Sequence, residues 1–311
     1  MPQLHTVHIL LATYNGERFL SKQLESIVQQ SYRNWTVTIS DDGSTDETLI
    51  IVERFARQVQ QPVFVLQGPK NGCSTANFFH LVSKAPIVNN VDLYAFCDQD
   101  DIWHDDKLER AVKWHMQHLD KNVRLYCGRT EYISVNLQSL GLSPSINQLP
   151  SFGNALVQNI ASGNTMVFNY PVLISLKKVL PEHSIWHDWT TYVVATALEG
   201  FVYFDDEPCV YYRQHESNVI GKNNGFLAQL KRLPFLFNGR YRKWSNLTEQ
   251  CINDIHEELS KNSLSIFQDF KDMRSAPSFI SRIKKFKNSN IRRQNISSNI
   301  LLVVALIFGL A

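Results

Sequence analysis

The chain has 311 residues, of which 44% are hydrophobic and 19% are charged, a composition typical of a globular protein with a substantial core. Its formal net charge of +2 is too small for a protein that tracks nucleic-acid phosphates, so we expect no nucleic-acid partner. The five cysteines form no CxxC pair, which excludes the usual zinc site and disulfide framework and indicates a reducing compartment.

Strands and helices are predicted to alternate along the first part of the chain. Short strand-like runs occupy residues 7–12, 35–40, 63–66 and 93–97, and the segments between them carry apolar residues at helical spacing. A further helix is predicted around Leu108, Val112 and Leu119. This alternation is typical of an α/β fold with a mainly parallel sheet, in which ligands bind at the carboxyl ends of the strands.

The middle of the chain is less regular. We predict extended segments or strands at residues 124–132, 164–169, 202–204 and 209–213, and a helix at 189–198. No repeat or low-complexity linker interrupts this part of the sequence. We therefore predict one folded domain over residues 1–225 and a helical, basic C-terminal region over residues 226–311.

Acidic residues crowd the end of the strand predicted at 93–97. Asp98, Asp100 and Asp101 follow it directly, and carboxylates this close repel one another unless a cation lies between them. Oxygen ligands suit Mg²⁺ or Mn²⁺, although a helix-capping role for one of these acids stays open. Asp41 and Asp42 end another predicted strand at the same edge. Because GxGxxG and GxxxxGK[ST] are both absent, a bound diphosphate would need a metal ion.

Six motifs, in order between residues 7 and 221, resemble the family 2 glycosyltransferases with a GT-A fold, and more narrowly the bacterial rhamnosyltransferase-like members that build surface polysaccharides. The motifs occupy residues 12–17, 40–46, 71–72, 98–103, 187–189 and 213–218. The resemblance implies a Rossmann-like sheet flanked by helices. It also implies transfer of a sugar, such as L-rhamnose from dTDP-rhamnose, from a dTDP- or UDP-sugar donor to a lipid-linked or growing surface-polysaccharide acceptor.

The same resemblance implies roles for residues at the donor site. Thr13, Tyr14 and Glu17 would line the nucleotide pocket, and Asp41 would accept a hydrogen bond from the pyrimidine ring. Gly72 would let the backbone approach the nucleotide. A turn-forming role for Asp41 stays open, and Asp42 is expected to be the structural member of the pair.

The metal and the diphosphate are assigned to a second group of residues. Asp100 would be the direct ligand of Mg²⁺ or Mn²⁺, with Asp98 near the metal or the ribose. His215 would supply a third ligand, and a surface or hydrogen-bonded role for it stays open. Arg213 would face the diphosphate, and Asp101 would support the loop.

Asp188 is the expected catalytic base. Inverting transfer needs one base on the acceptor hydroxyl, and the family places it in this motif. His187 replaces the commoner Glu, so its role is open, and Asp188 could instead cap the following helix. Two other functions remain possible at this point: a sugar-phosphate nucleotidyltransferase and a non-catalytic, membrane-bound scaffold that binds nucleotide sugars.

The C-terminal region combines positive charge with apolar residues. Arg282, Lys284, Lys285, Lys287, Arg292 and Arg293 precede the apolar residues 300–311, whose twelve positions would give a helix of ~18 Å, short of the ~30 Å hydrocarbon core. We expect this run, with a second basic patch at residues 226–244, to lie on a membrane surface. A core or subunit-interface role stays open. With no secretory signal, we expect a cytoplasmic protein on the inner face of the cell membrane.

Overall fold

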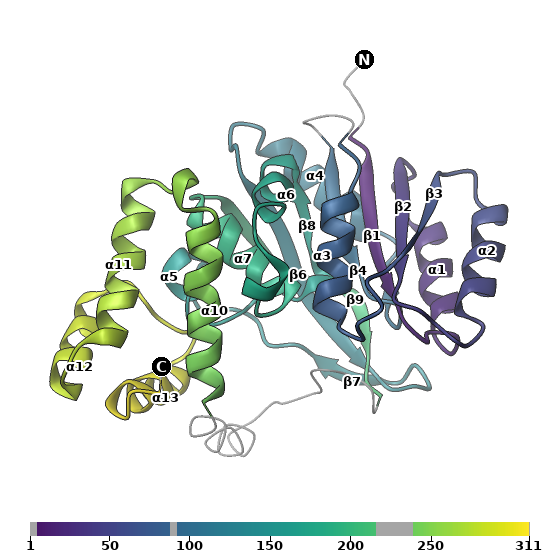
Figure 1. Cartoon of the computed structure of the whole chain (residues 1–311). Coiled ribbons are helices and arrows are strands. Elements are labelled where there is room, and N and C mark those ends of the chain that lie inside the picture. Colours follow the sequence, from purple (N-terminus) through teal and green to yellow (C-terminus); the bar gives the residue numbers. More distant parts are fainter. Residues whose placement is uncertain (1–4, 88–91, 216–238, 311) are drawn as a thin grey trace.

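A nine-stranded sheet forms the centre of the computed structural model, which describes residues 5–87, 92–215 and 239–310 (Figure 1). The strand order is β3-β2-β1-β4-β8-β6-β9-β5, and β7 pairs with β6. The strands are β1 Val7–Thr13, β2 Trp35–Asp41, β3 Val63–Gln67, β4 Leu93–Cys97, β5 Ile102–Trp103, β6 Arg124–Ile133, β7 Ser139–Leu142, β8 Val167–Asn169 and β9 Phe201–Arg213.

The helices cover both faces of this sheet, which confirms the predicted α/β fold. They are α1 Leu20–Gln29, α2 Thr48–Gln58, α3 Ser74–Lys84, α4 Lys107–Gln117, α5 Phe152–Ala155, α6 Tyr170–Leu176 and α7 His187–Ala197, with short 3₁₀ turns at Gly163–Thr165 and Pro181–His183. The first four strands in space, β3 to β4, run parallel as predicted. Beyond β4 the sheet is mixed, because β8 pairs antiparallel with both β4 and β6.

Two hydrophobic cores explain why the central strands are apolar throughout. In β1, Ile9 and Leu11 pack with α1 and α4, whereas Leu10 packs on the opposite face with α3 and α7. In β4, Ala95 and Phe96 divide between the two faces in the same way. Successive strand residues point to opposite faces, so a strand covered on both sides reads as a continuous apolar run.

The structure corrects the sequence prediction in the second half of the sheet. The two strands predicted at 202–204 and 209–213 are one long strand, β9, whose pairing with β6 shifts register between Gly128 and Thr130. The strand predicted at 164–169 is shorter, because residues 163–165 form a 3₁₀ turn before β8. Local apolar patterns cannot reveal either feature, since both depend on pairing with β6.

Four C-terminal helices pack against the sheet domain at the end opposite β3 (Figure 1). They are α10 Arg240–Asp254, α11 Lys261–Ser275, α12 Phe279–Asn288 and α13 Ile296–Ile307, with a 3₁₀ turn at His256–Glu258. Ile252, Phe270 and Leu302 belong to the same hydrophobic core as Trp189 and Tyr192 of α7. The predicted boundary between residues 225 and 226 lies outside the described residues.

The predicted apolar run at residues 300–311 is divided between core and surface. Leu302, Ala305 and Leu306 of α13 are buried, while Ile300 and Phe308 are exposed. One face of α13 therefore completes the core, the alternative that the sequence left open. Among the described residues, no helix combines the length and apolar character needed to cross a bilayer.

The shared core predicts that the C-terminal helices unfold together with the sheet domain. Phe270→Ala removes a buried side chain and should lower the free energy of unfolding by about 3–5 kcal/mol in a single cooperative transition, measured by urea titration. Phe279→Ala, at a position that is 52% exposed on α12, should change it by less than about 0.5 kcal/mol. Two separate transitions, or equal effects of the two variants, would contradict the shared core.

Candidate active site

The ends of three parallel strands bring the predicted site residues to one edge of the sheet. Thr13 at the end of β1 pairs in register with Asp41 at the end of β2. Leu11 of β1 pairs with Cys97, the last residue of β4, so Asp98 directly follows the end of the strand next to β1. The sequence prediction that Thr13, Asp41 and Asp98 share an edge is thereby met.

Asp41 forms a turn at this edge. Its buried carboxylate accepts hydrogen bonds from the backbone N–H groups of Gly43 (3.1 Å) and Ser44 (2.8 Å) and from the Thr13 hydroxyl (3.0 Å). This is the turn-forming role that the sequence left open. Contact between Asp41 and a nucleotide base stays a prediction.

Asp42 and Gly72 hold the neighbouring loop. The Asp42 carboxylate accepts hydrogen bonds from the backbone N–H groups of Lys70 (2.6 Å) and Gly72 (2.8 Å), so Asp42 has the structural role predicted for it, and Asp41 shares such a role. Gly72 has a φ of +67°, which other residues rarely adopt. Its backbone N–H therefore serves Asp42, and contact with a nucleotide stays a prediction.

Gln99 joins the loop after β1 to the acidic loop after β4. Its side-chain amide accepts from the Tyr14 backbone N–H and donates to the Tyr14 carbonyl, both at 2.9 Å. A Cβ at Gly16 would lie 2.3 Å from Gln99 Oε1, so only glycine leaves the Gln99 side chain in this position. No sequence pattern predicts this link, although Gln99 stands between two of the predicted ligands. The exposed Tyr14 side chain lies at the same edge.

Glu17 connects the β1 loop to the beginning of α2. Its backbone N–H donates to Asp46 (3.1 Å), and its carboxylate accepts from the Glu47 backbone N–H (3.0 Å). These bonds give Glu17 a role in shaping the loop. The predicted lining of a nucleotide pocket by Glu17 stays a prediction.

Two of the three predicted metal ligands, Asp100 and His215, lie close together. His215 Nε2 is 2.8 Å from Asp100 Oδ2, and the His215 ring stacks on Phe19 at 4.9 Å. Burial, followed by the nearby charges of Asp100 and Asp188, raises the pKa of Asp98 to about 8. Carboxylate and imidazole donors fit a divalent cation chemically. Within the described ranges, however, no three His, Cys, Asp or Glu side chains converge as a ready-made metal site.

Asp101 supports the acidic loop from beneath, as predicted. It is fully buried and accepts hydrogen bonds from the Asn164 amide and the Arg213 backbone N–H (3.3 Å). Arg213 Nε in turn donates to the Asp100 carbonyl at 3.0 Å, and its side chain lies over Phe19. Because Arg213 is only 3% exposed, its observed role is to fix the loop. Its contact with a diphosphate stays a prediction.

A buried cation that no sequence pattern predicts lies near the same loop. Lys107 is fully buried, and its Nζ lies 3.2 Å from the centroid of the Trp103 ring. Burial lowers its pKa to about 8, while negative charge at Asp101 and Asp98 acts in the opposite direction. Lys107 thus places positive charge behind the crowded carboxylates. A lysine in the first turn of a helix is usually exposed, so the sequence does not indicate that Lys107 is buried.

Asp188 lies in the first turn of α7, close enough to the acidic loop for its charge to raise the pKa of Asp98. The N-cap of α7 is Trp186, so the capping role left open for Asp188 is not the one observed. Burial raises the pKa of Asp188 to about 6, partly offset by hydrogen bonds from Trp189, Gly163 and Asn159. A carboxyl group with this pKa is largely ionised at neutral pH and basic enough to accept a proton.

His187 packs as an uncharged aromatic group. Its ring stacks on Phe78 at 3.7 Å and meets Phe96 edge-on at 5.0 Å, and burial lowers its pKa to about 3. A Cβ at Gly163 would lie 2.4 Å from His187 Nε2, so glycine is needed there as well. His187 therefore anchors the beginning of α7 and, with it, the position of Asp188.

The comparisons with known proteins agree with this arrangement. The model of the family "Glycosyl transferase family 2" matches residues 8–170. The dTDP-rhamnosyl transferase RfbG of Shigella flexneri is 34% identical over 244 residues, which cover 75% of this chain and 81% of that protein. The chain belongs to glycosyltransferase family 2. It is accordingly a glycosyltransferase, similar to rhamnosyltransferases, rather than a non-catalytic scaffold.

Solved structures confirm the GT-A fold. Residues 1–349 of S. aureus TarS, in complex with UDP-GlcNAc, align with a TM-score of 0.56 at 17% identity, covering 91% of this chain and 89% of that one. A longer TarS chain aligns with a TM-score of 0.52, and the match covers 67% of this chain but 37% of TarS. The chain thus shares its fold with a protein whose structure was solved with UDP-GlcNAc bound.

The Gln99 link predicts a specific defect in donor use. Gln99→Ala removes two hydrogen bonds that hold the Tyr14 loop, each contributing about 1 kcal/mol, so KM for the nucleotide-sugar donor should rise about tenfold with a smaller change in kcat. Gln117→Ala, on the exposed face of α4, is the matched control and should leave both constants unchanged. Steady-state transfer assays measure both constants, and an unchanged donor KM in the Gln99 variant would contradict the role.

Proposed function

We propose that this protein is an inverting, metal-dependent glycosyltransferase that moves L-rhamnose from dTDP-rhamnose to a lipid-linked or growing surface-polysaccharide acceptor. The observation that carries the proposal is the placement of Asp188, a carboxyl group of raised pKa, opposite the acidic loop of Asp98 and Asp100. The similarity to the dTDP-rhamnosyl transferase RfbG supports the choice of sugar.

The residues divide the chemistry between them. Asp188 accepts the proton of the acceptor hydroxyl, whose oxygen attacks the anomeric carbon while the bond to the diphosphate breaks on the opposite side, which inverts the configuration. Asp98, Asp100 and His215 would hold Mg²⁺ or Mn²⁺. Such an ion, when bound, compensates the negative charge that develops on the leaving diphosphate. Gln99 and Arg213 keep the loops at the edge in position.

The base assignment predicts a separation of binding from transfer. Asp188→Asn removes the proton acceptor but preserves size, so transfer should fall at least about a hundredfold while donor affinity, measured by calorimetry, stays within about twofold. Asp120→Asn, at an exposed position, is the matched control and should transfer at the normal rate. Substantial residual transfer by the Asp188 variant would overturn the assignment.

The metal assignment predicts dependence on a divalent ion. Dialysis against EDTA should abolish transfer, and Mn²⁺ or Mg²⁺ should restore it, because the crowded carboxylates of Asp98 and Asp100 leave the diphosphate uncompensated without a cation. Asp100→Asn should require a higher metal concentration for half-maximal rate. Full activity after EDTA treatment, with metal content checked by mass spectrometry, would exclude this part of the proposal.

The proposed acceptor places the enzyme at the inner face of the cell membrane. The Escherichia coli relative named as a glucosyltransferase that acts on GlcNAc-diphosphoundecaprenol, WfgD, is 26% identical over 132 residues, 42% of this chain and 48% of that protein. The exposed apolar residues of α13 also support a membrane-facing surface. The basic patch predicted at residues 226–244 lies mostly outside the described residues.

A further inference from the structure

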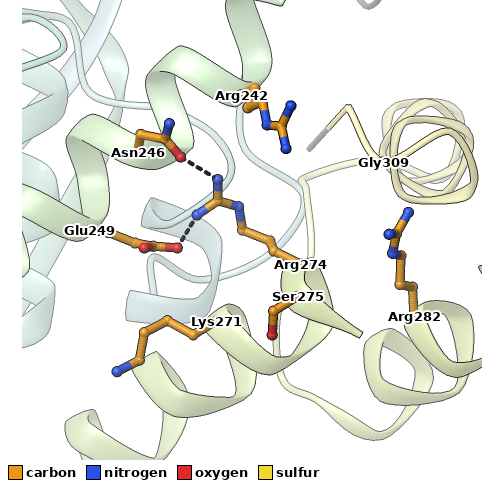
Figure 2. A pocket seen from close by; sticks show the side chains of 8 residues that line it. All are labelled: Arg242, Asn246, Glu249, Lys271, Arg274, Ser275, Arg282 and Gly309. Atoms are coloured by element: carbon orange, nitrogen blue, oxygen red, sulfur yellow. Dashed lines mark hydrogen bonds and ion pairs between the residues drawn. The ribbon is translucent and has the colours of Figure 1, made fainter. Parts of the chain in front are cut away.

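A basic pocket opens between the C-terminal helices (Figure 2). It has a volume of about 610 Å³, and the residues that line it come from α10, α11, α12 and the end of α13. They are Arg242, Asn246, Glu249, Lys271, Arg274 and Arg282, together with Ser275 and Gly309. The pocket takes no part in the chemistry proposed above.

The charges in this pocket are strongly unbalanced. Four cationic side chains line it, with Glu249 as the one carboxylate among the described lining residues. Arg274 donates to Glu249 and to Asn246 Oδ1 (2.7 Å), which uses up that carboxylate. Burial and the neighbouring Arg242 lower the pKa of Arg274 to about 10. The side chains that line the pocket therefore have a net charge of +3, four cations less one carboxylate, and this charge would stabilise a bound anion.

The pocket is held in shape by backbone contacts. Arg282 Nε donates to the Ala276 carbonyl at 2.8 Å, and its Nη1 donates to the Leu306 carbonyl at 3.1 Å. These bonds tie the beginning of α12 to the end of α11 and to the end of α13. The guanidinium is thus positioned at the pocket before any ligand arrives, which reduces the entropy cost of binding.

Apolar side chains stand next to the basic residues. Phe279 and Ile280 precede Arg282 on α12, and Ile280 is 66% exposed. Phe308, which is 60% exposed, directly precedes Gly309 of the pocket. A second pocket of about 350 Å³ on α12 and α13 is lined mainly by apolar side chains, including Ile296, Ile300, Val303 and Val304. The surface therefore suits a ligand that is anionic at one end and apolar at the other.

The position of the pocket on α10 separates it from the proposed base. Arg242, Asn246 and Glu249 lie on one face of this helix, while Trp244 lies on the opposite face and packs against Trp189 at 5.6 Å. Asp188 is adjacent to Trp189 in α7. The helix therefore stands between the pocket and the acceptor side of the active site, so the ligand is distinct from the transferred sugar and its acceptor.

We infer that this pocket binds the phosphate of an anionic membrane phospholipid, with Phe279, Ile280 and Phe308 entering the acyl-chain boundary of the bilayer. The excess positive charge selects an anion, and the neighbouring apolar side chains select a lipid over a free phosphate ion. The inference rests on the membrane placement in the proposed function and deepens it by naming the residues that make the contact.

Vesicle binding of the full-length protein tests this directly, without donor or metal. Wild type should sediment with vesicles of phosphatidylglycerol and phosphatidylcholine much more than with phosphatidylcholine alone. Arg242→Gln combined with Lys271→Gln should weaken this binding at least about tenfold, because each basic side chain near an anionic surface contributes measurably. These two positions are chosen because Arg274 and Arg282 also hold the helices together.

A charge-matched control separates the pocket from general basicity. Arg54→Gln combined with Lys113→Gln removes the same charge from exposed positions on α2 and α4, away from the C-terminal helices, and should weaken binding less than about threefold. Equal losses in the two double variants would overturn the inference. Transfer to a water-soluble acceptor should be unchanged in both, so a failure of the lipid site is distinguishable from a failure of the proposed enzyme activity.

A third comparison distinguishes a lipid from a free phosphate. Ile280→Ser should weaken vesicle binding at least about threefold, whereas Ile50→Ser, at a similarly exposed position on α2, should not. Inorganic phosphate at millimolar concentration should compete weakly with the vesicles. Strong competition by inorganic phosphate, together with full binding by the Ile280 variant, would show a soluble-anion site and overturn the proposal. Circular dichroism melting curves establish that each variant is folded.

Discussion

Crowding of negative charge at the ends of the central strands is the constraint on which the site depends. Asp98, Asp100 and Asp101 occupy four consecutive positions with Gln99, and Asp188 comes toward them from α7. Such a group is unstable unless donors and cations surround it. Asn164 and Arg213 donate hydrogen bonds to Asp101, and the charge of the buried Lys107 acts on Asp98 and Asp101 through space.

Neutral groups set the geometry around these charges. His187 stays uncharged because it is enclosed by Phe78 and Phe96, so it adds packing without altering the field at Asp188. Gln99 is also neutral and connects the acidic loop to the Tyr14 backbone. The charged residues thus carry the chemistry, and their uncharged neighbours determine where they stand.

Several features could be predicted from the sequence. They are the alternation of strands and helices, the shared edge of Asp41 and Asp98, and the structural roles of Asp42 and Asp101. Each follows from local periodicity or from strand ends in a parallel sheet. The sequence did not reveal the Gln99 link, the buried Lys107 or the fit of Gly163 against His187. Those contacts join segments distant in sequence, and no local pattern records them. The division of α13 between core and surface was open for the same reason.

The aromatic contact between α7 and α10 has a consequence for exchanging parts between relatives. Trp186 and Trp189 on either side of the proposed base pack against Trp244, at 5.4 and 5.6 Å, so aromatic packing joins two segments separated by the undescribed stretch. The family match ends at residue 170, before either segment. A chimera between relatives therefore has to carry α7 and α10 together, because replacing one of them alone would break this aromatic packing beside Asp188.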